Sequence, residues 1–361
     1  FNKKTEMQVF GWNGDIDTVL TPLDSIRYYK SFLRTAFMAM DSRNGHVKAY
    51  VGGINFANFQ YDGVSQGRRQ IGSTMKPFVY SLAMIEGFTP CDQLLHVQPI
   101  LFDENGKEWK PRNSTKARLG EMVTIQWGLQ QSSNWITASL MDKLSTKALE
   151  RLLRSYGFKG PIEAVPAMCL GTPDISVAEM VSAYSVFTNK GIRIEPMFVT
   201  SIEDTYGKTL ETFKPTMNEV LNEDATYKML SMLRSVVDAG TAGRIRFKYK
   251  ITAPMGGKTG TTQDNSDGWF MGFTPNLVAG CWVGGEDRYI HFTNMAEGQG
   301  AAVALPVYAI FMKKVYADKE LGYSEKENFD VPVEYRDPCT TGGKRSEEFN
   351  PDNIGIDEFF N

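Results

Sequence analysis

Cysteine and histidine are scarce in this sequence, which has 4 Cys and 3 His in 361 residues. No two cysteines form a CxxC pair or show metal-ligand spacing, and the histidines lie apart from one another and from any carboxylate motif. We therefore expect no structural metal and no cofactor. Buried or free thiols are the default, and a disulfide requires an oxidising compartment, although the sequence does not choose its pair. The residues concerned are Cys91, Cys169, Cys281, Cys339, His46, His96 and His291.

Long hydrophobic runs are also absent. No stretch approaches the roughly 20 apolar residues that cross a bilayer. The longest apolar run, 301–312, contains Pro306 and is followed by two lysines, so we expect a buried helix there. No signal peptide is visible and Phe1 is not a natural start, so we interpret the chain as a fragment of a longer protein.

Positive and negative charges are nearly balanced, with 39 Lys and Arg against 42 Asp and Glu, a formal net charge of −3. No basic stripe indicates nucleic acid as a partner. The acidic residues concentrate in 318–361, which we expect to be an acidic C-terminal extension that either folds over the surface or stays mobile. The rest of the chain is mildly positive, which suits an anionic substrate, although a solvated acidic tail on a neutral domain explains the asymmetry equally well.

Strand patterns occur at both ends of the chain and helical patterns lie between them. A hairpin is predicted over 34–53 and another over 258–283, whereas 90–240 is mainly helical. This order predicts an α+β fold in which an antiparallel sheet packs against helices, with a helical subdomain. We expect one domain over 31–317, preceded by a linker or edge segment over 1–30.

Three short motifs carry the chemistry. The first is Ser73-x-x-Lys76, at the end of a glycine-rich loop and the start of a predicted helix. Composition alone supplies roughly one such match in a chain of this length, but residues three apart share a helix face, so Lys76 can reach the Ser73 hydroxyl. Lysine can activate a serine only if its pKa falls well below about 10.4, which burial and a second nearby cation would achieve.

The second motif, Lys258-Thr259-Gly260, stands at the start of the second hairpin. Alone it is best explained as a strand end with a glycine bulge. In a site, Lys258 would supply the second cation, Thr259 and Thr261 would offer hydroxyls to a carboxylate, and Gly260 would let a peptide lie along the strand edge.

The third motif, Ser132-x-Asn134, follows a predicted helix and would usually be a turn or a cap. Combined with the other two, it offers a hydroxyl for proton transfer and an amide that holds a peptide bond. The three motifs occur in the order and context that penicillin-binding proteins and class A β-lactamases share.

On these motifs the chain resembles the transpeptidase domain of class A, bifunctional penicillin-binding proteins. Further similar segments extend the resemblance over 20–315, among them Pro22–Ile26, Arg69–Ser73, Leu170–Thr172 and Gly240–Ala242. The resemblance implies a five-stranded antiparallel sheet flanked by helices, with the site between the sheet and an all-helical subdomain. It also implies a membrane-anchored parent on the extracytoplasmic (periplasmic) side, with an N-terminal glycosyltransferase domain that is not visible in this chain.

The resemblance further implies a role for each site residue. Ser73 would be acylated by D-alanyl-D-alanine stem peptides or by β-lactam antibiotics, with Lys76 as base and Ser132 and Lys258 moving the proton to the leaving group. Substrate would be bound by Asn134, Thr259, Gly260 and Thr261, and an amine from a neighbouring stem peptide would accept the acyl group.

Other functions remain open from the sequence. A serine β-lactamase would need a glutamate-activated water, yet Glu163 and Glu179 lack the expected Glu-x-x-x-Asn pattern. A D,D-carboxypeptidase differs only in using water as the acceptor, and the motifs do not separate it. A β-lactam sensor and a non-catalytic scaffold are further alternatives, although the intact motifs speak against the scaffold.

Overall fold

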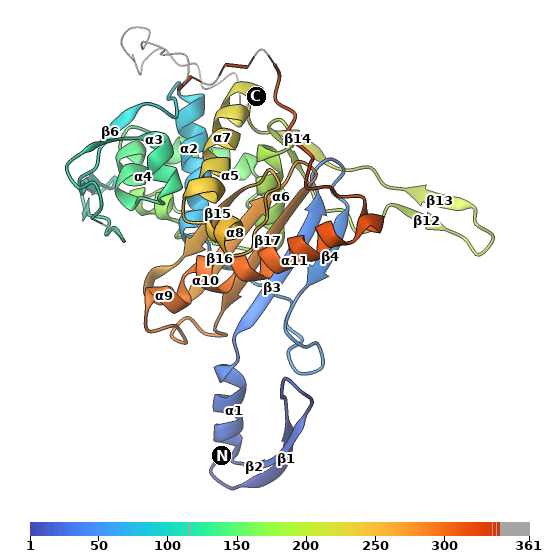
Figure 1. The fold of residues 1–361 in the computed structure, drawn as a ribbon. Helices are drawn as coiled ribbons and strands as arrows, with labels where there is room; N and C mark the ends of the chain where they lie inside the picture. The colour runs from blue at the N-terminus through green and yellow to red at the C-terminus, as the bar shows by residue number, and fades with distance from the viewer. Residues whose placement is uncertain (115, 334, 337, 340–361) are drawn as a thin grey trace.

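A five-stranded antiparallel sheet, in the order β15-β16-β17-β3-β4, forms the centre of the computed structural model, which describes residues 1–114, 116–333, 335–336 and 338–339 (Figure 1). Both predicted hairpins are therefore confirmed, and the second continues into a third strand. Strand β15 lies at one edge, and no strand among the described residues pairs with its backbone N–H and C=O groups on that side. The strands are β3 (Arg34–Asp41), β4 (Val47–Val51), β15 (Gly256–Thr261), β16 (Asp267–Phe273) and β17 (Leu277–Gly284).

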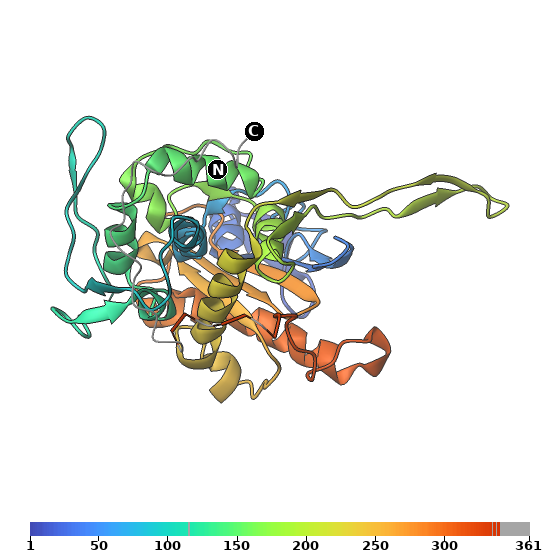
Figure 2. The ribbon, with the colours of Figure 1, turned by 90° about the horizontal axis from the view of Figure 1, so that it is seen from above.

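Helices cover both faces of this sheet, which explains why β16 and β17 are buried along their whole length. Helices α10 (Gly300–Val303) and α11 (Leu305–Ala317) pack on one face, and α6 (Val177–Tyr184) packs on the other (Figures 1 and 2). The window 300–317 is apolar and long enough to cross a membrane, but its apolar residues Leu305, Tyr308 and Met312 are buried against the sheet. The buried helix that we expected is confirmed, with a break at Ala304 before Pro306.

The helical subdomain surrounds α2 (Lys76–Ile85), which is buried over nearly all its length. Its first residue is Lys76, and Pro77 follows in the first turn, where a missing N–H breaks no intrahelical bond. Phe78 on α2 packs on Tyr156, Tyr184 and Phe187, and these contacts tie the helix to the rest of the subdomain. The surrounding helices are α3 (Ile125–Gln130), α4 (Asn134–Met141), α5 (Thr146–Ser155) and α7 (Glu223–Ala239).

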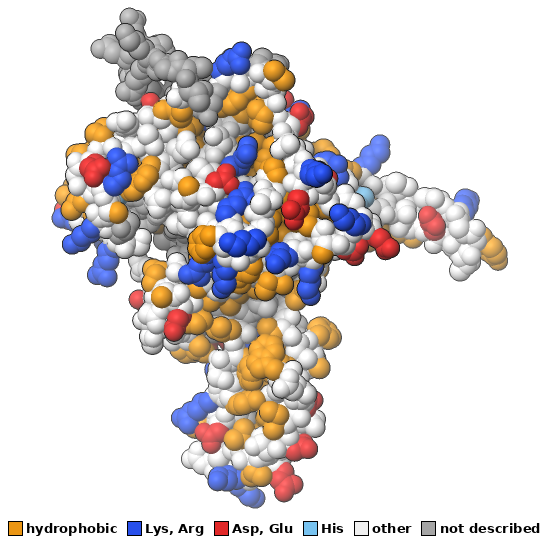
Figure 3. All heavy atoms as spheres, viewed as in Figure 1, with side chains coloured by type: hydrophobic (Ala, Val, Ile, Leu, Met, Phe, Trp, Pro, Cys, Tyr) orange, Lys and Arg blue, Asp and Glu red, His pale blue; other side chains and the backbone are white. Residues whose placement is uncertain are grey.

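An N-terminal arm occupies the segment that we expected to be a linker or an edge. It consists of the hairpin β1 (Thr5–Val9) and β2 (Ile16–Leu20) and the helix α1 (Pro22–Ser31), which Thr21 caps. The arm projects from the sheet at the start of β3, and hydrophobic side chains are exposed along it (Figures 1 and 3). Its aromatic residues Phe10 and Phe32 pack on Phe59 in the loop after β4.

The remaining elements are short. One of them, the hairpin β12–β13, extends far from the body (Figure 2). The strands are β5 (Arg69–Gln70), β6 (Gln93–Leu95), β7 (Leu101–Phe102), β8 (Glu108–Trp109), β9 (Met122–Thr124), β10 (Asp174–Ile175), β11 (Ile192–Ile194), β12 (Ser201–Glu203), β13 (Thr209–Thr212) and β14 (Met217–Glu219), and the helices are α8 (Arg244–Phe247) and α9 (Met295–Gly298).

A disulfide joins Cys91, after α2, to Cys339 in the C-terminal extension. The other two cysteines, Cys169 and Cys281, are buried free thiols. Before the disulfide, the extension contacts the body through Phe329, whose ring packs on Phe273. The described part of the acidic extension thus folds over the surface, whereas 340–361 lie outside the described residues.

Candidate active site

Ser73 lies in a 3₁₀ turn, Gly72–Met75, that leads directly into α2. The turn places Ser73 half-buried in the wall of a cavity of about 610 Å³ between the edge of the sheet and the helical subdomain. Asn134 and Thr261 line the same cavity. The three predicted motifs therefore meet here, one from α2, one from the start of α4 and one from β15.

Glycines bring the backbone on the sheet side of this cavity into close contact. Gly72 has φ of +51°, and a Cβ there would lie 2.7 Å from the Thr261 carbonyl oxygen. Gly171, at φ of +87°, lies against the backbone of Gly72, and a Cβ on Gly171 would lie 2.0 Å from the Gly72 carbonyl oxygen. A Cβ on Gly260 would lie 2.8 Å from the Ile71 carbonyl oxygen. The absence of a side chain at Gly260 is thus required for packing β15 against the Ser73 turn, a reason that the sequence did not reveal.

Ser132 has a backbone conformation that is uncommon for a serine. Its φ of +55° lies in the left-handed region, where a residue with a Cβ is strained by about 1–2 kcal/mol. The next residue, Ser133, caps α4 by accepting a hydrogen bond from the Ile136 N–H at 3.3 Å. The strained turn orients the Ser132 hydroxyl and its carbonyl oxygen toward Lys76.

Lys76 and Lys258 converge on the hydroxyl of Ser132, and both lysines are fully buried. Lys76 Nζ lies 3.2 Å from Ser132 Oγ and donates to the Ser132 carbonyl at 2.5 Å and to Asn134 Oδ1 at 2.7 Å. Lys258 Nζ lies 2.9 Å from the same Oγ. Within the described residues no hydrogen bond joins Lys76 to Ser73, and the Lys76 amine is directed at the 132–134 turn instead.

Burial lowers the pKa of both amines. The pKa of Lys76 falls well below its usual value, first because of desolvation and second because of the like charge of Lys258. Desolvation lowers the pKa of Lys258 to about 7. The expectation of a lysine with a lowered pKa beside a second cation agrees with the burial of both amines and with their shared contact to the Ser132 hydroxyl. A lower pKa increases the fraction of amine that is neutral and able to accept a proton.

The hydroxyls of Thr259, in the second motif, and of the neighbouring Thr261 are partly engaged. Thr259 Oγ1 lies 2.8 Å from Thr241 Oγ1, and Thr261 Oγ1 accepts from the Gly300 N–H at 3.1 Å. The Thr261 O–H therefore remains available as a donor, and Thr261 lines the cavity. Thr241 was not expected in the site, although Gly240–Ala242 is one of the segments that carry the resemblance.

Two further residues that the sequence did not indicate, His96 and Asn113, hold the 132–134 turn. Asn113 Oδ1 accepts from the Asn134 N–H at 2.9 Å, and Asn134 Nδ2 donates to the Arg112 carbonyl at 2.7 Å. His96 is fully buried between Trp127 and Trp135, with Nε2 at 3.0 Å from Ser133 Oγ and 3.3 Å from Asn113 Nδ2. No local pattern signals these contacts, because their partners lie 21 and 37 residues away.

Comparison with known proteins decides the family. A model described as "Penicillin binding protein transpeptidase domain" matches residues 35–280, and one described as "Penicillin-binding protein middle domain" matches residues 1–33. The chain belongs to the penicillin-binding protein transpeptidase family. The N-terminal arm of this transpeptidase chain is thus similar to part of the family's middle domain.

Individual relatives agree with this assignment. Penicillin-binding protein 1A of Aquifex aeolicus is 32% identical over 303 residues, which cover 84% of this chain and 40% of that protein. The chain thus spans about two fifths of the length of this relative. The crystal structure of penicillin-binding protein 1A from Haemophilus influenzae, 26% identical, superposes with a TM-score of 0.75 over 83% of this chain and 49% of that one. PonA1 from Mycobacterium tuberculosis, in complex with penicillin V, shares the fold at 24% identity and a TM-score of 0.67, over 84% of this chain and 81% of that one.

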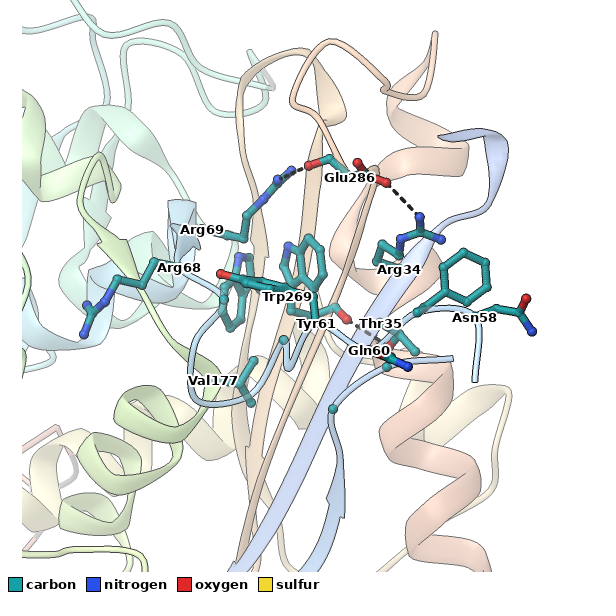
Figure 4. A pocket seen from close by; sticks show the side chains of 16 residues that line it. Arg34, Thr35, Asn58, Gln60, Tyr61, Arg68, Arg69, Val177, Trp269 and Glu286 are labelled. Atoms are coloured by element: carbon teal, nitrogen blue, oxygen red, sulfur yellow. Dashed lines mark hydrogen bonds and ion pairs between the residues drawn. The ribbon is translucent and has the colours of Figure 1, made fainter. Parts of the chain in front are cut away.

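The transpeptidase domain has a second cavity, of about 570 Å³, between the loop after β4 and the sheet (Figure 4). It shares no lining residue with the cavity of Ser73. Its arginines already have partners: Arg34 pairs with Glu286 at 2.8 Å and Arg69 with Asp267 at 2.6 Å. Arg69 is four residues from Ser73, so this cavity and the candidate site share one continuous stretch of backbone.

Proposed function

We propose that this chain is a peptidoglycan D,D-transpeptidase that forms an acyl-enzyme at Ser73 with D-alanyl-D-alanine stem peptides. The observation that carries the proposal is the convergence of Lys76 and Lys258, two buried amines, on the Ser132 hydroxyl in the motif cluster that contains Ser73. A serine needs a base to become a nucleophile, and a desolvated lysine beside a second cation is one of the few bases available at neutral pH.

In the first half-reaction, the neutral amine of Lys76 takes the proton of the Ser73 hydroxyl. The Ser73 oxygen attacks the carbonyl carbon of the penultimate D-alanine, and the carbonyl electrons move to its oxygen. As the C–N bond breaks, Ser132 passes a proton to the departing D-alanine amine, with Lys258 at 2.9 Å resupplying the Ser132 hydroxyl. The product is an ester at Ser73.

Backbone N–H groups of Ser73 and Thr261 would hold the oxyanion. Thr262 donates its N–H to Asp267 on β16, and successive N–H groups of a strand point to opposite sides, so the Thr261 N–H points to the open edge of β15. One such donor commonly lowers the activation barrier by about 3–4 kcal/mol. Thr259 and Thr261 would bind the terminal carboxylate, Gly260 would lie along the bound peptide, and Asn134 would orient the donor peptide.

In the second half-reaction, an amine of a neighbouring stem peptide attacks the ester carbonyl and gives a proton to Lys258 through Ser132. The C–O bond to Ser73 then breaks, and the Ser73 oxygen regains its proton from Lys76. A β-lactam would enter the same route and remain as an acyl-enzyme. Two observations support transpeptidation over β-lactamase activity. Glu163 is exposed and does not line the cavity, and the carboxylate of Glu179 is engaged by Arg68 and Ser176. A D,D-carboxypeptidase would use the same site with water as the acceptor, and a β-lactam sensor would keep the adduct as a signal.

We further propose that the parent protein acts at the extracytoplasmic face of the membrane with a glycosyltransferase domain. The Cys91–Cys339 disulfide supports an oxidising location, since such bonds persist mainly outside the cytoplasm. The similarity to penicillin-binding protein 1A sequences supports the two-domain parent.

Acylation by a labelled penicillin tests the proposal. We expect the wild-type chain to retain the label for hours and Ser73→Ala to take up none. Release of D-alanine from a stem peptide should then depend on an added amine. An adduct on Ser73→Ala would overturn the proposal, fast hydrolysis of the label would indicate a β-lactamase, and amine-independent release would indicate a carboxypeptidase. A stable label without any release of D-alanine would indicate a sensor.

A further inference from the structure

Three charged residues line the cavity of Ser73 outside the three motifs, and their environments differ. Lys110 pairs with Glu108 at 2.5 Å, so its charge is compensated. Asp264 comes from the loop between β15 and β16. Arg112 is exposed, and no carboxylate pairs with it in the part of the chain that the structure describes. One uncompensated cation therefore faces the space in which a substrate would lie.

The backbone that carries Arg112 is fastened to the 132–134 turn and to α4. The Arg112 carbonyl accepts from Asn134 Nδ2 at 2.7 Å, the Pro111 carbonyl accepts from the Trp135 indole N–H at 3.1 Å, and Asn113 Oδ1 accepts from the Asn134 N–H. Three consecutive residues thus hold the base of the Arg112 side chain beside Asn134. This anchoring distinguishes Arg112 from an arginine on a free surface loop, because its position relative to the catalytic turn is fixed.

The direction of a bound peptide follows from the site. Its terminal carboxylate would lie at Thr259 and Thr261, its scissile carbonyl at Ser73, and the amide before that carbonyl at Asn134. The residues upstream of the D-alanyl-D-alanine end would then extend past Asn134 toward Arg112. A guanidinium with free N–H donors matches a carboxylate, which it can bind through two hydrogen bonds.

We propose that Arg112 binds a carboxylate carried by the donor stem peptide upstream of D-alanyl-D-alanine, so that the enzyme prefers anionic donors. The inference rests on the proposed function and adds a substrate class to it. Two positions of the peptide could supply the group: the residue directly before D-alanyl-D-alanine, or the one before that.

Penicillins with different side chains test the proposal, because the penicillin side chain occupies the place of the upstream peptide. The measurement is the second-order acylation rate constant for three penicillins, whose side chains are neutral, α-carboxy or α-amino, in competition with a labelled penicillin. The ring carboxylate is common to all three and cancels in their ratios. We expect the wild type to prefer the α-carboxy over the α-amino compound, and Arg112→Gln to reduce this ratio about three- to fivefold, the upper part of the range for an exposed ion pair. High salt should shrink the ratio in the wild type.

Lys110→Gln is the matched control, because Lys110 lines the same cavity but its ammonium is already paired. The ratio should stay within twofold in that variant. Equal loss in both variants, or a wild type without preference, would overturn the proposal. The proposed function fails separately, by the absence of any adduct with the neutral penicillin. Stem peptides with a carboxamide in place of the carboxylate at one or the other upstream position then identify the source, since only amidation at the bound position should remove the dependence on Arg112. If the reaction still depends on Arg112 with both amidated peptides, the proposal is also overturned.

Discussion

On the sheet side of the cleft, backbone segments touch one another through glycines, whereas on the helical side a strained turn is held by side chains. Gly171, Gly72 and Thr261 lie in direct contact, and a Cβ added at either glycine would meet a carbonyl oxygen. By contrast, Ser132 keeps its φ of +55° next to residues that Asn113, His96 and Lys76 bind. The first arrangement tolerates no added atom, and the second depends on specific hydrogen-bond donors and acceptors.

This difference predicts how each side fails. Steric contacts in a close-packed region are all-or-none, because backbone atoms cannot move aside without shifting whole elements. Hydrogen bonds that hold a turn fail gradually, since another residue or water can replace part of a lost contact. Substitutions on the sheet side should therefore affect stability and acylation together, and those on the helical side should affect acylation more than stability.

The largest effect is expected for Gly171→Ala. The new Cβ would lie 2.0 Å from the Gly72 oxygen at a φ of +87°, so we expect a loss of about 3 kcal/mol or more in the free energy of unfolding and no measurable penicillin acylation. Urea unfolding and adduct formation measure the two effects. Gly87→Ala is the matched control, because Gly87 has φ of +88° but no atom within 4 Å of the added Cβ, and a loss of only about 1 kcal/mol is expected there. Similar losses at both positions would show that backbone conformation, rather than the contact, matters at Gly171.

An intermediate effect is expected for Lys258→Met, which removes the amine that lies between the two sides. Without the like charge of Lys258, the pKa of Lys76 should rise. Acylation should therefore be slower, and the fall of its rate on the acidic side of the pH–rate profile should move to higher pH. The wild-type chain should also gain stability from about pH 7 toward 10.5, because over that range the folded state binds fewer protons at Lys258 than the unfolded state does. The variant should show a smaller slope of stability with pH, whereas Lys143→Met, at an exposed lysine, should keep the wild-type slope. If the acidic side of the pH–rate profile did not move in the variant, the role of Lys258 as the second cation would be contradicted.

The sequence predicted the parts of this site that are local. Ser73 and Lys76 share a helical turn, Lys258 through Thr261 share a strand, and the hairpins that order the sheet are marked by turns and alternation. The sequence also predicted that a lysine would need burial and a second cation, because that follows from the chemistry of serine activation rather than from a fold.

The supports of the site could not be predicted, because they join residues that are distant in the chain. Thr241 meets Thr259 across 18 residues, and the disulfide spans 248. The strain at Ser132 and the reason for Gly260 depend on which backbones touch, and only the folded chain determines that. The N-terminal arm, expected as a linker or edge, forms a hairpin and a helix. Thr21 caps α1 and Pro22 is its first residue, and the aromatic residues of the arm pack on Phe59.

The smallest effect is expected for His96→Phe, and it tests the helical side most directly. Phenylalanine keeps an aromatic ring between Trp127 and Trp135 but removes both ring nitrogens. Nδ1 lies 3.3 Å from the Arg118 carbonyl, which can only accept, so Nε2 is the acceptor that faces Ser133 Oγ and Asn113 Nδ2. Loss of these hydrogen bonds should slow acylation about tenfold, whereas the free energy of unfolding should fall by only about 0.5–1 kcal/mol. His96→Gln, whose amide oxygen can accept in place of Nε2, should recover part of the acylation rate. If both variants acylate at the wild-type rate, the turn is held by Asn113 and Lys76 alone. If glutamine fails to improve on phenylalanine, ring packing rather than hydrogen bonding positions Ser132 and Asn134.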